Sequence, residues 1–315
     1  MQNYLLSIVI PLFNEETNLT PLIAKLTKVL SLLTSFKDHE IILVNDGSSD
    51  GSLVECKQLA SQNSNVKIVS FLRNFGHEYA TFAGIKYASG DAVVLIDADG
   101  QDPAELILEF EKEFIKGYDI VYGQRTKRLN ESHLKKLTSK LFYPVFKYLT
   151  NVDIPHSTGD FCMISKRVAD IIKNLPEKTI FIRGLIYWTG LPKKAVPFVR
   201  LARKAGTTKY NYFKLTVFAL ENIISFSTKP IYYVIFFSLF LMSLCLMSIG
   251  IAIFMWFMGF VKTIGWTSLI ITVLFSFSVT LFFMGILGLY IGKIFHEIKQ
   301  RPVFLVDEFI NFDNK

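Results

Sequence analysis

The stretch DAVVLIDADGQDP, residues 91–103, places two carboxylates, Asp97 and Asp99, directly after five apolar residues. Such a short apolar run, rich in β-branched residues, is typical of a buried strand in a parallel sheet. In parallel α/β sheets, ligands bind beyond the carboxyl ends of the strands. Because side chains two residues apart on an extended chain point to the same side, Asp97 and Asp99 are predicted to face one ligand.

The first 208 residues or so alternate short apolar runs with stretches of helical spacing. Besides the run at 92–99, four runs have the composition of buried strands: SIVIPLF (7–13), EIILVND (40–46), VKIVSFL (66–72) and DIVYGQR (119–125). The segments between them have the spacing and length of helices: 15–35, 51–62, 76–89 and 103–116. Strands that alternate with helices form right-handed βαβ crossovers, so residues 1–208 are predicted to form an α/β domain with a mainly parallel sheet.

Charge and hydropathy restrict the class of partner. The 315 residues carry a net charge of +7, which suits an acidic surface, phosphates or nucleic acid. However, 51 % of the residues are hydrophobic, only 19 % are charged and the mean hydropathy is +0.36, which is too apolar for an ordinary basic nucleic-acid binder. A membrane is therefore the expected partner, and nucleic acid is not.

The cysteines and the N-terminus indicate a reducing compartment and no secretory leader. Cys56, Cys162 and Cys245 are odd in number and far apart, with no Cys-x-x-Cys pair, so all three are predicted to be buried packing residues. No Lys or Arg precedes the first apolar run, which argues against a signal peptide.

Two uncharged stretches lie near the C-terminus, from Pro230 to Val261 and from Thr263 to Gly292. A membrane-spanning helix needs about 20 apolar residues, so transmembrane helices are predicted at 230–258 and 265–292. Their length and lack of charge argue against the alternative, two core helices of a large soluble protein. The flanks are basic, and the positive-inside rule predicts cytoplasmic termini with a cytoplasmic tail at 293–315.

Two further segments have a basic, amphipathic pattern. Residues 132–151 place five apolar side chains on one helical face among four lysines, and residues 209–229 lead directly into the first predicted span. Helices of this kind lie in the membrane interface. The alternative for both is packing against their own domain.

Two carboxylates at a strand end suit Mg²⁺ or Mn²⁺, because these ions prefer oxygen ligands and leave positions open for phosphate. Asp-x-Asp alone is a common pattern. Asp102-Pro103 has the form of a helix N-cap followed by the first helical residue, so a capping role is the alternative for nearby acids.

The order of several motifs narrows these alternatives. SIVIPLFNEETNL, ILVNDGSSDGS, RNFGHEYA and GDAVVLIDADGQDP, each at its predicted strand, together resemble family 2 glycosyltransferases with the GT-A nucleotide-sugar fold. STGDF (157–161), FIRGLIYWTG (181–190) and VRLARKAGTTKY (199–210), followed by two spans, are similar to the polyprenyl-phosphate branch of that family. This branch includes dolichol-phosphate mannose synthases and bactoprenol glucosyltransferases.

The resemblance implies roles for individual residues. Donor-nucleotide binding falls to Pro11, Phe13, Glu15, Asp46, Asp97 and Asp99, and metal binding falls to Asp97, Asp99 and Gln101. A Glu suits ribose hydroxyls, Phe13 would stack on the base where many relatives have Tyr, and Asp46 would accept a base N–H. Turn or cap chemistry is the alternative for Glu15 and Asp46.

Asp160 matches the catalytic base of the family. A phosphate monoester, with a second pKa near ~6, is already mostly dianionic at neutral pH, so Asp160 is expected to orient a substrate rather than take a proton. Four basic residues are assigned to the phosphate groups of donor and acceptor: Arg125, Arg200, Arg203 and Lys209. Their alternative is a general positive-inside role near the membrane. His77 is more typical of a loop or packing histidine than of a catalyst, and no role is assigned to it.

The resemblance implies an integral membrane hexosyltransferase that moves one sugar, with inversion, from a nucleotide sugar to undecaprenyl phosphate. The product would be a lipid-linked sugar donor for cell-envelope glycan or protein modification. UDP-glucose is the favoured donor, with GDP-mannose or a catalytically silent nucleotide-binding scaffold as alternatives. No Gln-x-x-Arg-Trp motif of processive synthases occurs, nor does a Rossmann or P-loop glycine motif after a strand. A homo-oligomer is compatible with the sequence.

Overall fold

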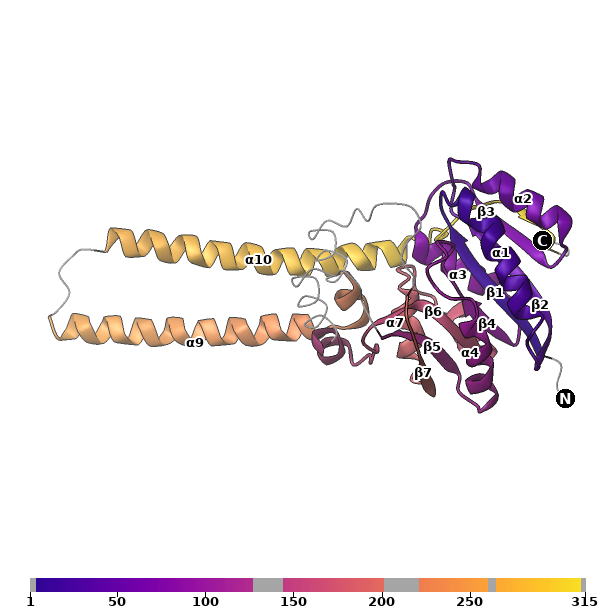
Figure 1. Cartoon of the computed structure of the whole chain (residues 1–315). Helices are drawn as coiled ribbons and strands as arrows, with labels where there is room; N and C mark the ends of the chain where they lie inside the picture. The colour runs from indigo at the N-terminus through magenta and orange to yellow at the C-terminus, as the bar shows by residue number, and fades with distance from the viewer. Residues whose placement is uncertain (1–3, 127–143, 201–220, 260–264, 313–315) are drawn as a thin grey trace. The chain divides into compact units, whose positions relative to one another are not determined.

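A computed structural model describes residues 4–126, 144–200, 221–259 and 265–312. The chain divides into two compact units. One is drawn from Met1–Lys147, Val152–Lys209 and Arg301–Lys315, and the other from Tyr148–Asn151 and Tyr210–Gln300. The first unit is the α/β domain, and the second holds the two long helices (Figure 1).

The strands of the first unit form one eight-stranded sheet among the described residues. Its order is β7-β5-β6-β4-β1-β2-β3-β8. The bounds are β1 Tyr4–Leu12, β2 Phe36–Asn45, β3 Val66–Phe71, β4 Ala92–Leu95, β5 Ile120–Arg125, β6 Thr158–Ser165, β7 Lys193–Phe198 and β8 Val306–Ile310. β4, β1, β2 and β3 are parallel neighbours, as are β5 and β7, whereas β6 is antiparallel to both β4 and β5. The predicted α/β fold with a mainly parallel sheet is confirmed.

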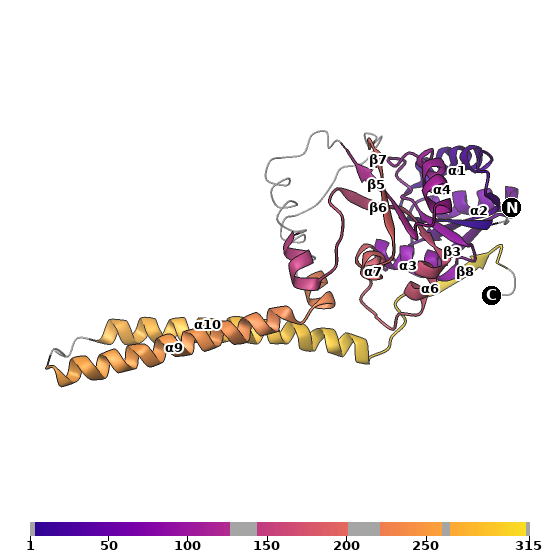
Figure 2. The same ribbon diagram turned by 90° about the horizontal axis from the view of Figure 1, so that it is seen from below.

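Helices cover both faces of this sheet (Figure 2). On one face, α1 (Glu16–Leu30), α2 (Ser52–Gln62) and α4 (Leu106–Ile115) contribute to the main apolar core. On the other face lie α3 (His77–Tyr87), α6 (Lys166–Lys173) and α7 (Ile182–Trp188). The strands are apolar on both sides because both faces are covered. Because the helices pack on the two faces, the ends of the strands are the part of the sheet that they leave uncovered.

A buried carboxylate near the start of the central strands is fully paired. Glu40 on β2 is 3 % exposed and accepts hydrogen bonds from Ser7 Oγ (2.6 Å), Lys67 Nζ (2.7 Å) and the Ser89 N–H (2.7 Å). Burial alone would raise the pKa of the Glu40 carboxyl, but these bonds outweigh it, and the pKa lies below its ordinary value of 4.5. The ionised form is thus the one that the fold stabilises.

The segment after the second long helix returns to the α/β domain. Residues 293–315 were expected to be a tail, but β8 pairs antiparallel with β3, and Phe304 stacks on Phe71 with ring centroids 4.9 Å apart. Asn311 also donates to the carbonyls of Ala60 and Val66. The expectation of a tail was wrong because a five-residue strand with two acids gives little pattern to detect.

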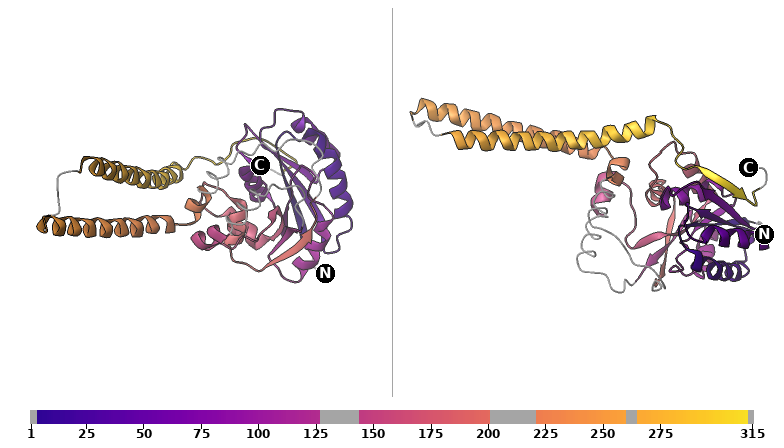
Figure 3. Two further views of the ribbon diagram at one scale, coloured as in Figure 1. Left: turned by 60° about the vertical axis from the view of Figure 1, so that its left-hand side comes forward. Right: turned by 90° about the horizontal axis from the view of Figure 1, so that it is seen from above.

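The second unit contains two long apolar helices, α9 (Lys229–Phe257) and α10 (Trp266–Ile298), which lie side by side (Figure 3). Within them, Lys229–Ser248 and Thr272–Ile298 are long and apolar enough to cross a membrane, with a mean hydropathy of 2.1 each. The exposed Cys245 lies on α9, whereas Cys56 and Cys162 are buried in the α/β domain. The prediction of burial was therefore wrong for Cys245, because most of the described side chains around it on α9 are exposed and pack against no other part of the protein.

The predicted amphipathic helices fall largely outside the described residues. Residues 132–143 and 209–220 are among those not described, while 144–150 are helical. Within the second unit, Lys229 Nζ donates to the carbonyl of Tyr148 and to Asn151 Oδ1. The interfacial role of both segments stays a prediction.

We expect Glu40→Gln to reduce the free energy of unfolding by about 1–3 kcal/mol at pH 7, because an ionised, buried partner of Lys67 is lost. The folded pKa of Glu40 is lowered, so its contribution is present above the ordinary value of 4.5 and fades as pH falls below it. Denaturant unfolding of the detergent-solubilised chain at pH 7 and pH 4 measures both effects. Glu109→Gln, at an exposed position of α4, is the control; equal stability of Glu40→Gln and wild type at pH 7 would contradict the expectation.

Candidate active site

Asp97 and Asp99 follow β4 at the carboxyl end of the parallel strands. β4 ends at Leu95, earlier than the predicted strand at 92–99, because the chain turns where the acids begin. Both carboxylates face one group: Asp97 Oδ2 and Asp99 Oδ2 lie 3.9 Å and 3.7 Å from Nη2 of Arg200. Both carboxylates therefore lie within reach of one cation, but Asp99 lies in a turn and not on an extended strand, as the spacing argument assumed.

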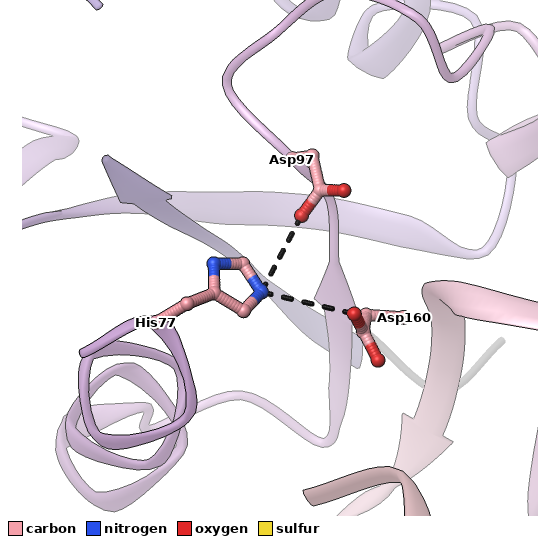
Figure 4. Close-up of side chains that lie close together, drawn as sticks. All are labelled: His77, Asp97 and Asp160. Carbon is pink, nitrogen blue, oxygen red and sulfur yellow. Dashed lines mark ion pairs between the residues drawn. The ribbon is translucent and has the colours of Figure 1, made fainter. Parts of the chain in front are cut away.

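His77 brings a cation to this edge of the sheet. It is the first residue of α3, and its Nε2 lies 3.6 Å from Asp97 Oδ1 and 3.7 Å from Asp160 Oδ2 (Figure 4). Burial would lower the pKa of the imidazole, but the two carboxylates outweigh it and raise that pKa to about 9. The two carboxylates thus favour the protonated imidazole, and the structure places at the site a histidine to which the sequence assigned no role.

The ligand atoms of His77, Asp97 and Asp160 all lie within 4.8 Å of one another. A neutral imidazole and two carboxylates would offer a metal ion one nitrogen and two oxygen ligands, and such binding would require His77 to lose its proton. The three residues come from α3, the loop after β4, and β6, so only the folded sheet brings them together.

Asp160 lies on β6 and is held by Arg183, the second residue of α7. Both Nε (3.0 Å) and Nη2 (2.8 Å) of Arg183 donate to Asp160 Oδ1. Burial would raise the pKa of the Asp160 carboxyl, but Arg183 and His77 outweigh it and keep that pKa well below its usual range. The carboxylate is therefore ionised throughout the physiological pH range.

Asp102 is a third acid beside the pair at the end of β4. Its side chain is fully buried, neither carboxylate oxygen has a hydrogen-bond partner, and Arg200 Nε lies 3.5 Å from Oδ1. Burial, with the charge of Asp97, raises the pKa of Asp102 to about 6. It does not cap α4, which begins at Leu106 with Glu105 in the capping position, so the capping reading was wrong.

Of the four predicted phosphate-binding cations, Arg125 and Arg200 are described. Arg125 ends β5, and its guanidinium lies against Gly159, where an added Cβ would make the end of the arginine side chain shift. Its Nε is buried without a hydrogen-bond partner. Arg203 and Lys209 lie outside the described residues. The structure thus brings two of the four to the acids and does not test the other two.

Four of the residues assigned to the nucleotide lie at or just after the carboxyl ends of β1 and β2. Pro11 is in β1, and Phe13 follows it with 45 % of its surface exposed. Glu15 Oε2 accepts a hydrogen bond from Asn18 Nδ2. Asp46 is 2 % exposed, and its two oxygens accept the N–H groups of Phe75 (2.7 Å) and Gly76 (2.9 Å).

Asp46 therefore orders the loop that leads into α3 and His77, which is the turn role named as its alternative. Gln101 donates its backbone N–H to Asp99 Oδ1 at 3.0 Å. Nucleotide contacts of Pro11, Phe13, Glu15 and Asp46, and a metal contact of Gln101, stay predictions.

Three residues at or beside the site were assigned no role from the sequence: His77, Arg183, and Glu78, whose Oε2 accepts the N–H of Ile182 at the start of α7. His77 and Glu78 lie within RNFGHEYA, and Arg183 lies within FIRGLIYWTG. Both stretches were noticed only as parts of a family pattern. A charged residue at the start of a helix that faces the strand ends was the available signal.

The comparisons with known proteins agree with this geometry. A family model described as glycosyl transferase family 2 matches residues 7–172. An uncharacterized glycosyltransferase of Synechocystis is 43 % identical, over 96 % of this chain and 95 % of that protein. The uncharacterized glycosyltransferase YkcC of Bacillus subtilis is 38 % identical, over 98 % of this chain and 95 % of that protein.

A bactoprenol glucosyl transferase of Shigella phage SfII is 37 % identical, over 96 % of this chain and 97 % of that protein. The resemblance drawn from the motifs is therefore confirmed. Similarity along nearly the whole chain, on a GT-A-like sheet with acids at its carboxyl edge, shows that this chain belongs to glycosyl transferase family 2.

Proposed function

We propose that the chain moves one sugar from a nucleotide sugar to undecaprenyl phosphate at a membrane. The observation that carries the proposal is the group of acids and cations around Asp97, Asp99 and Asp160 in a chain that also has two membrane-length apolar helices. Relatives that match 96 % of this chain over 97 % of their own length are named bactoprenol glucosyl transferases, which supports a polyprenyl acceptor and glucose as the sugar. UDP-glucose is accordingly the favoured donor, ahead of GDP-mannose.

In the proposed reaction, an oxygen of the lipid phosphate forms a bond to the anomeric carbon of the donor. The bond from that carbon to the nucleoside diphosphate breaks on the opposite face, so the configuration inverts and the diphosphate leaves with the electron pair. Arg200 and Arg125 are the cations that would stabilise this departing charge. Arginine suits the task because its guanidinium donates to phosphate oxygens in pairs.

The chemistry of the acids fits a divalent ion. Asp97 and Asp99 would hold Mg²⁺ or Mn²⁺, with Gln101 as a further oxygen donor, because hard cations take carboxylate and carbonyl oxygens. Arg200 lies within 4 Å of both carboxylates. The pair of acids thus already has one positive charge beside it, which supports the proposal that a cation binds between them. When bound, the ion would neutralise the donor diphosphate.

Asp160 is proposed to position a substrate and not to act as a base. Efficient general bases have a pKa near the operating pH, whereas Arg183 and His77 keep the pKa of Asp160 well below its usual range. A phosphate monoester, already dianionic, gives such a carboxylate no proton to take. Asp160 Oδ2, which lies 3.7 Å from His77 Nε2 while Oδ1 accepts both Arg183 hydrogen bonds, is the oxygen proposed to accept a substrate hydroxyl.

The other candidate function is a catalytically silent scaffold. Loss of an acid would favour that reading, but Asp97, Asp99 and Asp160 are all present at one edge of the sheet. Incubation of the purified chain with undecaprenyl phosphate and a panel of labelled nucleotide sugars tests the proposal. Transfer from none of them would favour the scaffold.

Asp99→Asn is expected to lower turnover by about 10²-fold or more, because a hard anionic ligand becomes a neutral amide at unchanged size. EDTA should reduce wild-type activity similarly, and added Mn²⁺ or Mg²⁺ should restore it. Initial rates of lipid-linked sugar formation measure both, with Asp38→Asn, at an exposed position of β2, as the control. Full activity of Asp99→Asn, or of wild type in EDTA, would refute the metal site.

Asp160→Asn separates positioning from base catalysis. We expect the variant to keep a reduced turnover that rises as pH passes the second pKa of the phosphate, near ~6, because the lipid phosphate ionises without help. The measurement is single-turnover transfer from about pH 5.5 to 8 at saturating donor and metal. A variant that binds both substrates normally but is inactive at every pH would establish Asp160 as an obligatory base.

Both termini are proposed to be cytoplasmic. The flanks of the helix pair are basic, with Lys229 before it and Lys299 and Arg301 after it, and short basic flanks favour the cytoplasmic side. A reporter fused after Lys315 should behave as cytoplasmic, and one inserted at Lys262 as external. The reverse pattern would overturn this topology.

A further inference from the structure

The two carboxylate oxygens of Asp160 have different partners. Both hydrogen bonds from Arg183 end on Oδ1, at 3.0 Å and 2.8 Å, whereas Oδ2 lies 3.7 Å from His77 Nε2. A guanidinium offers two N–H groups in a fixed plane, and a carboxylate oxygen accepts about two hydrogen bonds. Arg183 therefore occupies one oxygen and fixes the direction of the other.

The position of Arg183 depends in turn on how α7 begins. Arg183 is the second residue of this seven-residue helix, and the capping residue, Phe181, makes no side-chain cap hydrogen bond. Instead, Glu78 Oε2 accepts the N–H of Ile182 at 2.8 Å. Glu78 is 104 residues away in the chain, so this contact is a tertiary anchor for the first turn of α7.

Glu78 and His77 are neighbours in the first turn of α3, and they act on the same carboxylate from two sides. His77 faces Asp160 Oδ2 directly, while Glu78 fixes the helix that carries the partner of Oδ1. The first turns of α3 (His77 and Glu78) and α7 (Ile182 and Arg183) thus surround Asp160, and we call these four residues the frame.

We propose that Glu78 and Arg183 are positioning residues of the transfer reaction: Glu78 anchors α7, and Arg183 then holds Asp160 with Oδ2 turned to the substrate. This inference rests on the proposed function. Neither residue touches the reacting atoms, so their effect passes entirely through Asp160. A small displacement of a substrate-positioning group lowers turnover by up to about 10²-fold.

Kinetics of conservative and truncating variants provide the first test. Arg183→Lys keeps the charge but loses the paired geometry, and we expect its kcat to fall about tenfold or more, with the donor KM within about twofold of wild type. Glu78→Gln retains an oxygen that accepts the Ile182 N–H and should remain within about threefold of wild type, whereas Glu78→Ala should lose about tenfold. If the negative charge of Glu78 were required, Glu78→Gln would lose activity as Glu78→Ala does. Activity of the Gln variant alone would therefore show that the hydrogen-bond acceptor is what matters.

Controls separate positioning from a structural role. Arg167→Gln and Glu109→Gln remove exposed charges on α6 and α4 and should leave kcat, KM and the thermal unfolding midpoint unchanged. A midpoint of Arg183→Lys within a few degrees of wild type would assign its loss of kcat to positioning. Wild-type kcat in Arg183→Lys or in Glu78→Ala, or a loss seen only in KM or in the unfolding midpoint, would overturn the proposal.

A structural readout keeps the inference separate from the proposed function. Structures of the full-length wild type and Glu78→Ala, at a resolution that defines side chains, should show the Asp160 carboxylate turned away from Arg183 only in the variant. If Asp160 keeps both hydrogen bonds from Arg183 in Glu78→Ala, the frame is refuted whichever sugar or acceptor the wild type uses. If the wild type transferred sugar from no donor, the proposed function would be refuted instead. The comparison of the wild-type and Glu78→Ala structures would still test the frame.

Discussion

Repulsion among carboxylates is the constraint on which the site depends. Four acids meet at the carboxyl edge of the central strands: Asp97, Asp99, Asp102 and Asp160. Two unit charges about 4 Å apart repel by about 4 kcal/mol even at an effective dielectric constant of about 20. The fold offsets this repulsion with cations from four separate places: His77, Arg125, Arg183 and Arg200. None of these cations is a sequence neighbour of the acids that it faces.

This alternation of charge suits the proposed substrates, a nucleotide sugar and a lipid phosphate, which are both anionic. Acids alone would repel a nucleotide diphosphate and a lipid phosphate, and cations alone would bind them without leaving a place for a divalent ion. In the described part of the site, Arg200 approaches three acids at 3.5–3.9 Å, longer than a good hydrogen bond. A phosphate or a divalent ion would therefore compete with loose ion pairs and would displace no strong hydrogen bond of Arg200.

The sequence predicted the features that repeat along the chain and missed those that arise between distant segments. Buried parallel strands and long apolar helices have a periodicity or a length that can be read directly, and Asp97 and Asp99 follow from a strand end. His77 and Arg183 carry no such signal, because their meaning comes from α3 and α7 meeting β6. Asp102 was misread for the same reason: its local pattern fits a cap, while its surroundings are Arg200 and a buried core.

The return of the chain to the sheet ties these features together. β3 pairs with β8 on one side, and the segment after β3 leads through Phe75 and Gly76, which bind Asp46, to His77 at the start of α3. Phe304, just before β8, packs on Phe71 of β3 and on Phe82 of α3. Since strands from before and after the two apolar helices share one sheet, both ends of the helix pair must lie on the same side of any membrane that the pair crosses. β8, which the sequence did not predict, thus implies an even number of membrane crossings by the helix pair. The segment that contains Phe304 and β8 also packs against α3, the helix that begins with His77.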